Sequence, residues 1–208
     1  MHYLRKQQQI QNNLKKELYK IGNADILNKS KLKDVIINAI IKTAGIKVTK
    51  PVNAKFNTEE EQDPVNIYAI EWTALFIPKI LSSFKEARKS KDKKRKLKNS
   101  SNMGSNIIVN DAKNSMQYIK QIEPNKKAVE SAKLLAKGKE PKVKGVKVWL
   151  HSGNSNGRPE HIALNNKAVP IGKKFNVGGE LMSRPGNGSI KNTAYCNCSI
   201  YVKLDKGA

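Results

Sequence analysis

The stretch Tyr195-Cys-Asn-Cys-Ser-Ile-Tyr-Val-Lys-Leu204 decides how the C-terminal part of this chain folds. Successive side chains of a β-strand point to opposite faces, so residues two apart share a face. One face here would hold Cys196, Cys198, Ile200, Val202 and Leu204. The pattern therefore predicts a half-buried strand with both cysteines turned inward.

Further strand and turn signals precede this stretch. Residues 144–150 alternate in the same way and predict the first strand of a terminal module that spans residues 143–208. The pair Asn165-Asn166, between two short apolar runs, predicts a tight hairpin turn. Gly178-Gly179 does not fit a phosphate-binding motif and predicts a turn between short strands.

The first 142 residues carry apolar side chains at helical spacing. The predicted helices span about residues 3–20, 24–43, 64–88, 111–122 and 124–138. Pro78 should kink the third helix, and Asp111 should cap the fourth. Residues 47–63 are predicted to be a connection. We expect an α+β protein: a helical N-terminal region, residues 1–142, followed by the β-rich module.

The chain is strongly basic. Its 208 residues include 40 Lys and Arg against 17 Asp and Glu, a formal net charge of +23. A polyanion neutralises such a charge, so nucleic acid is the predicted partner. The alternative is that a lysine-rich genome makes basic proteins for compositional reasons.

The positive charge is concentrated between residues 85 and 98, a segment that contains nine basic residues and two acidic ones. We expect a solvated basic arm over about residues 85–105 that contacts the phosphates of double-stranded DNA without sequence preference. The alternative is a charged linker. The predicted contacts are Lys85, Arg88, Lys89, Lys91, Lys93, Lys94, Arg95, Lys96 and Lys98.

The third predicted helix is the most apolar and contains Trp72 among other aromatic residues. Aromatic side chains can stack on nucleic-acid bases. An aromatic stripe at helical spacing is more often part of a hydrophobic core. We therefore assign Trp72 to the core.

The last third of the chain contains an ordered series of distinctive residues. The series runs Trp149, Arg158-Pro-Glu-His161, Phe175-Asn-Val-Gly178, Arg184-Pro185-Gly186 and Cys196-Asn-Cys198. It resembles the C-terminal domain of the phage Mu F-like minor head proteins, also called the phage head morphogenesis family. The resemblance covers about sixty residues and implies structural roles for Trp149, Arg158, His161, Phe175, Pro185, Gly186, Cys196 and Cys198.

The chain departs from the family pattern at three places. Family members often have an acidic residue after the tryptophan, two arginines before the histidine and Cys-Arg-Cys at the end. This chain has Ser152-Gly153-Asn154, the single Arg158 and Asn197. We therefore assign to no residue of this chain the role that the second arginine has in the family.

The resemblance implies a virion protein that sits near the portal and enters the capsid during assembly. Such a protein influences how packaged DNA is retained or ejected. The expected partners are double-stranded DNA and the portal protein, the major capsid protein or both. The expected location is the virion interior, and the host cytoplasm during assembly. The oligomeric state is not predicted.

Possible metal ligands gather in the terminal module, namely His151 or His161 with Cys196 and Cys198. Thiolates and imidazoles are ligands that zinc prefers. A C-x-C pair on an extended strand, however, could chelate an ion only with distortion. We therefore predict no metal and no cofactor, with zinc as the alternative.

A histidine near a thiol could also act as a base beside a nucleophile. The acidic residues Glu160, Glu180 and Asp205 are spread out, and they suggest neither an orienting group nor a two-metal site. We therefore expect a protein that is not an enzyme. The alternatives are a nucleic-acid-processing enzyme with a His/Cys site and a nucleic-acid-binding protein unrelated to virions.

The chain also carries signals about its compartment. The two cysteines are too few for a secreted disulfide scaffold, so we expect reduced thiols. Residues 1–8 lack the apolar segment of a signal peptide, and the longest apolar run, residues 35–41, is too short to span a bilayer. We expect no membrane partner.

Overall fold

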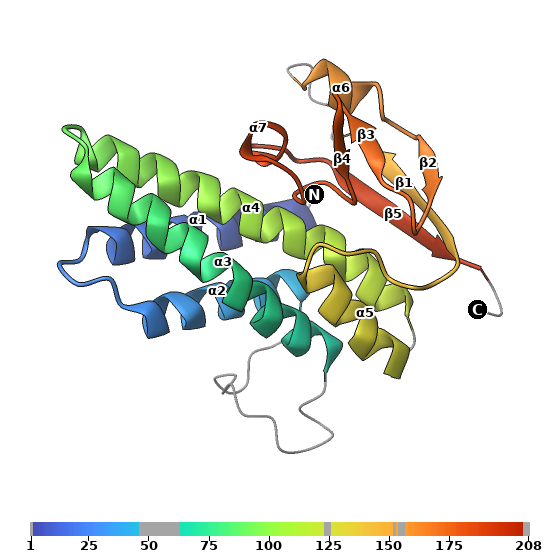
Figure 1. Cartoon of the computed structure of the whole chain (residues 1–208), viewed down its shortest axis with the longest axis horizontal. Helices are drawn as coiled ribbons and strands as arrows, with labels where there is room; N and C mark the ends of the chain where they lie inside the picture. Colours follow the sequence, from blue (N-terminus) through green and yellow to red (C-terminus); the bar gives the residue numbers. More distant parts are fainter. Residues whose placement is uncertain (1, 46–62, 123–125, 152, 154–156, 206–208) are drawn as a thin grey trace.

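The computed structural model describes residues 2–45, 63–122, 126–151, 153 and 157–205 (Figure 1). Five long helices come first and a small antiparallel sheet follows, which confirms the predicted α+β class. The long helices are α1 (His2–Asn23), α2 (Lys29–Ala44), α3 (Pro64–Lys89), α4 (Lys93–Gln121) and α5 (Lys126–Ala136). Within the described ranges, none of the helices is both long and apolar enough to cross a lipid bilayer. Apart from Asp63, the predicted connection lies outside the described residues.

Side-chain caps set the ends of α2 and α3. The Asn28 side chain accepts a hydrogen bond from the Lys31 backbone N–H and starts α2, five residues later than predicted. Asp63 caps α3, whose first residue is Pro64. The helix continues through Pro78 to Lys89.

Helix α4 differs most from the prediction. It begins at Lys93, after the cap Asp92, and so includes most of the segment that we expected to be a solvated arm. Leu97, Ser101 and Ser105 are buried, and the Ser101 hydroxyl donates to the Leu97 carbonyl at 2.8 Å. The expectation of an unpacked arm up to residue 105 is therefore wrong, because small side chains let this end of α4 pack within the helical layer.

The sheet lies over α4 at one end of the molecule (Figure 1). Its central strand pairs antiparallel with both neighbours, in the order β2-β1-β5. A separate hairpin, β3-β4, turns at Gly178-Gly179, as predicted. The strands are β1 (Gly145–Leu150), β2 (Ala168–Pro170), β3 (Phe175–Val177), β4 (Glu180–Met182) and β5 (Ser199–Leu204), and the short helices are α6 (Pro159–Ile162) and α7 (Ile190–Thr193).

Two local predictions in the module are wrong. The last strand begins at Ser199, because Tyr195 has a φ of 57° and the chain turns there. The end of helix α6 and the turn that follows it stand where the first arm of a hairpin was expected, and Asn166, with a φ of 62°, ends this turn before β2.

The inner face of β1 carries Lys147 and Trp149, both buried, while Val146 is exposed. The Lys147 ammonium donates to the Glu140 carboxylate at 2.6 Å and lies over the Phe175 ring. Burial lowers the pKa of Lys147 to about 8, although Glu140 opposes this shift. The module thus holds a lysine inside its core by pairing it with an acid.

One buried carboxylate connects the helices to the module. Asp111, in the middle of α4, accepts hydrogen bonds from the Tyr68 hydroxyl at 2.8 Å and from the Trp72 indole. It also pairs with Arg184, whose Nε lies 3.0 Å away. Arg184 is fully buried and donates to the Leu135 carbonyl at 2.8 Å. Asp111 is therefore the polar centre of the core, and its predicted role as a helix cap is wrong.

We predict that Asp111→Asn lowers the free energy of unfolding by about 3–5 kcal/mol, because it leaves the buried Arg184 charge unpaired. Urea denaturation followed by circular dichroism measures the change. Asp34→Asn, at an exposed position of α2, is the control and should change stability by less than about 0.5 kcal/mol. Equal effects of the two substitutions would contradict the proposed role of Asp111.

Candidate functional site

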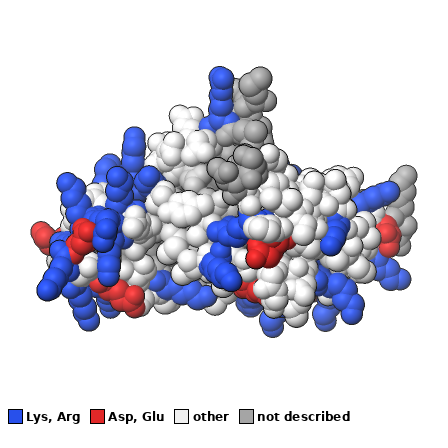
Figure 2. All heavy atoms as spheres, turned by 90° about the horizontal axis from the view of Figure 1, so that it is seen from above, with Lys and Arg blue, Asp and Glu red and all other residues white. Residues whose placement is uncertain are grey.

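The basic residues predicted to bind DNA lie around the turn between α3 and α4. Residues 85–89 form the last part of α3, and residues 93–98 form the first turns of α4. All except Arg88 are exposed. Figure 2 shows Lys and Arg side chains crowded at the left end of the molecule, where Figure 1 places this turn. We call these eight exposed side chains the basic end: Lys85, Lys89, Lys91, Lys93, Lys94, Arg95, Lys96 and Lys98.

Arg88 is part of the fold. Its guanidinium donates to the Gly22 carbonyl at 2.8 Å and also to the carbonyls of Ala24 and Asp25. These carbonyls lie at and just beyond the C-terminal end of α1. Arg88 therefore ties α3 to α1, and we remove it from the predicted DNA contacts.

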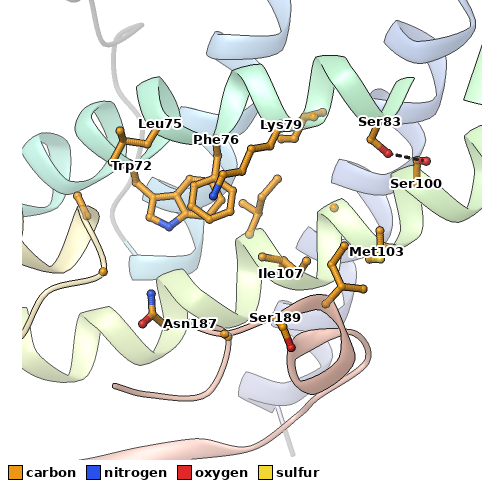
Figure 3. A pocket seen from close by; sticks show the side chains of 18 of the residues that line it. Trp72, Leu75, Phe76, Lys79, Ser83, Ser100, Met103, Ile107, Asn187 and Ser189 are labelled. Carbon is orange, nitrogen blue, oxygen red and sulfur yellow. Dashed lines mark hydrogen bonds between the residues drawn. The ribbon is translucent and has the colours of Figure 1, made fainter. Parts of the chain in front are cut away.

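A mostly apolar hollow of about 640 Å³ lies between α3, α4 and the loop at residues 186–190 (Figure 3). Trp72 and Phe76 line it, and their rings stack with centroids 3.8 Å apart. The Trp72 indole N–H already binds Asp111, and its side chain is buried. Trp72 thus belongs to the core, as predicted, and has no face open for a nucleic-acid base.

Five residues of the terminal series meet in one buried cluster. The Trp149 ring packs edge to face on His161, with centroids 5.5 Å apart, and on Phe175 at 5.2 Å. Cys196 and Cys198 lie against the same histidine. Residues from β1, α6, β3 and the approach to β5 therefore build a single site, although they are far apart in the sequence.

The cysteines and the histidine form the polar part of this cluster. His161 Nδ1 lies 3.4 Å from the sulfur of Cys196 and 3.6 Å from that of Cys198. The three side chains are 2–3% exposed, and no disulfide joins the cysteines. A hydrogen bond with Cys198 lowers the pKa of the Cys196 thiol, although burial acts in the opposite direction.

Helix α4 holds the loop that carries the cysteines. The Asn110 side chain donates to the Cys196 carbonyl at 2.6 Å, and the Lys113 ammonium donates to the Cys198 carbonyl at 3.2 Å. The Asn114 side chain accepts from the Ile200 N–H at 2.9 Å. Sequence reasoning missed these residues, although Asn110 and Asn114 are four apart and so share a helix face.

The other members of the terminal series fix the surrounding backbone. Arg158 donates to the Ala194 carbonyl at 2.7 Å, just before the turn at Tyr195. The Pro185 carbonyl accepts from the Asn114 side chain at 3.1 Å. Gly186 has a φ of 90° and lies against the backbone of α4.

Comparisons of the chain with models of protein families, with curated proteins and with solved structures find no match. The likeness to the phage Mu F-like family therefore stays a prediction from the terminal residue series. The function is inferred from the geometry of the basic end and the buried cluster.

We predict that Gly186→Ala destabilises the protein by about 1–3 kcal/mol, because an alanine at this φ is strained. Its Cβ would also lie 2.8 Å from the Asp111 backbone nitrogen. Thermal unfolding measures the effect. Gly172→Ala is the control, since a Cβ there meets nothing within 4 Å. A Gly186→Ala protein as stable as the control would show that the loop does not need this close approach to α4.

Proposed function

We propose that this protein binds double-stranded DNA through the basic end, without sequence preference, as a minor head or inner capsid protein of a phage. In this role it contacts packaged DNA and the portal or coat subunits. It acts in head assembly and in the retention or ejection of the genome, and it is not an enzyme.

The observation that supports DNA binding is the concentration of positive charge around the turn between α3 and α4. Eight exposed basic side chains lie within fourteen consecutive residues, with Glu86 and Asp92 as the acidic residues of that stretch. One of the eight, Arg95, pairs with Asp92 at 2.7 Å. The remaining cations form no ion pair among the described residues, so they are available for phosphates.

The chemistry of the basic end favours contact with the DNA backbone over contact with base edges. Seven of its eight side chains are lysines, which bind phosphate as point charges. Reading of bases relies more on bidentate Arg, Asn and Gln side chains in the major groove. Binding through phosphates alone carries no direct sequence information. This is the property that a protein contacting a whole packaged genome requires.

The virion role is supported by the terminal residue series. Its aromatic, histidine and cysteine members come together in one buried cluster, as residues with a shared structural role would. The enzyme alternative has weaker support, because the thiols and imidazole are almost fully buried and a polymeric substrate could not reach them.

We predict that replacing Lys93, Lys94, Arg95 and Lys96 by alanine reduces the slope of log K against log salt for duplex DNA by up to about 3–4, if all four contact phosphates. The slope falls because fewer counterions are released from the DNA. Fluorescence anisotropy with two unrelated duplexes, over a series of salt concentrations, gives the slope and tests sequence independence.

A matched control removes four exposed lysines near the sheet: Lys142, Lys144, Lys173 and Lys203. It lowers the net charge by the same amount at the other end of the molecule (Figure 1). This control should keep most of the wild-type slope. An equal loss in both variants would mean that net charge, rather than the basic end, determines binding.

The virion role has its own test. Neighbouring genes for portal, terminase and coat proteins are expected, and the purified protein should associate with portal or coat subunits when they are produced together. DNA binding without either result would favour the alternative of a nucleic-acid-binding protein unrelated to virions.

A further inference from the structure

We propose that His161, Cys196 and Cys198 bind one zinc ion that ties α6 to the start of β5. The three side chains form a group whose ligand atoms all lie within 4.8 Å of one another. Two thiolates and an imidazole are a ligand set that zinc prefers, and one that calcium and magnesium avoid. The proposal is independent of DNA binding.

The distances fit a tetrahedral ion. Zn–S bonds of about 2.3 Å and Zn–N bonds of about 2.0–2.1 Å place sulfur and nitrogen ligands about 3.6 Å apart at the tetrahedral angle. The two distances from His161 Nδ1 to the cysteine sulfurs are 3.4 and 3.6 Å. Both nitrogen-to-sulfur distances therefore match the spacing that an ion between these atoms would require.

A hydrogen bond between His161 and one cysteine explains the positions of these three side chains less well than a bound ion does. A ring nitrogen has either one lone pair or one hydrogen. It can therefore make one well-directed hydrogen bond, yet two sulfurs lie at nearly equal distances from His161 Nδ1. A shared ion explains why both sulfurs converge on the same nitrogen.

The backbone removes the objection that a C-x-C pair on a strand cannot chelate. Cys196 does not belong to the strand: Tyr195, with a φ of 57°, turns the chain, and β5 starts only at Ser199. Both sulfurs can therefore reach one point. We predicted no metal because a C-x-C pair on an extended strand chelates poorly. That argument is wrong here, because the two cysteines precede the strand.

Neighbouring side chains hold the three ligands in place, while His161 Nε2 is buried and makes no hydrogen bond to the described residues, unlike the second ring nitrogen of most metal-binding histidines. Trp149 packs on the His161 ring and fixes its plane. The side chains of Asn110 and Lys113 bind the carbonyls of Cys196 and Cys198. The Lys113 ammonium also brings positive charge close to the two cysteines. Among the described residues His161, Cys196 and Cys198 are the possible ligands that lie together.

The test uses the full-length protein, purified under reducing conditions and stripped of metal with a chelator. Cobalt(II) added to it should produce the d–d bands of a tetrahedral site and sulfur-to-metal charge-transfer bands, complete at one equivalent. Zinc should displace the cobalt and raise the midpoint of thermal unfolding, because it binds the folded state. A folded protein that gives no such spectrum would overturn the proposal.

Variants locate the site. Cys198→Ser and His161→Gln should lose the cobalt spectrum and the zinc-dependent rise in the melting midpoint. His151→Gln and Asn197→Ala are the matched controls and should keep both, because neither side chain belongs to the cluster. Retention of the spectrum by Cys198→Ser or His161→Gln would refute the assignment.

Since those variants could fail to fold, alkylation of the wild-type protein provides a second measurement. Zinc should slow the reaction of Cys196 and Cys198 with iodoacetamide at least about tenfold, since a metal-bound thiolate is occupied. Mass spectrometry of the two sites follows the reaction. Rapid alkylation that zinc does not change would overturn the proposal and indicate a reactive thiol instead.

Discussion

The buried carboxylate of Asp111 is the constraint on which the rest of the structure depends. An unpaired charge inside a protein is very unfavourable, so Asp111 must be surrounded by donors. Three residues from two parts of the fold donate to it: Tyr68 and Trp72 on α3, and Arg184 in the terminal module. The fold can satisfy this acid only when the helices and the module are assembled together. The hydrophobic core accordingly runs without a break from the helices into the sheet.

The sequence predicts the elements whose pattern is local. Alternation placed Cys196 and Cys198 inside the module, and both are buried. Helical spacing located α1, α2, α3 and α5 within a few residues. The first half of α4 could not be found in this way, because its buried face consists largely of serine and asparagine. Its only large apolar side chain before residue 103 is Leu97.

The two candidate sites differ in the same way: one consists of residues that are neighbours in the sequence, and the other of residues that are far apart in it. The basic end is a run of neighbouring residues and can be read directly from the sequence. The meeting of His161 with the two cysteines depends on a turn at Tyr195, a residue type that rarely adopts a positive φ. The supports on α4, such as Asn110 and Asn114, are about 85 residues from the groups that they bind, since the hydrogen bonds span 86 and 84 positions. Only the assembled fold brings them together.

Helix α4 carries both candidate sites, the basic end at its start and the supports of the buried cluster in its second half. Lys96 and Asn110 are fourteen positions apart, which is about 21 Å along a helix at about 1.5 Å per residue. This distance exceeds the Debye length of about 8 Å at physiological salt, so the solvent around the exposed basic end largely screens its charges at this range. Because the basic side chains project from ordered helices rather than from a mobile arm, contact with DNA would order fewer backbone residues.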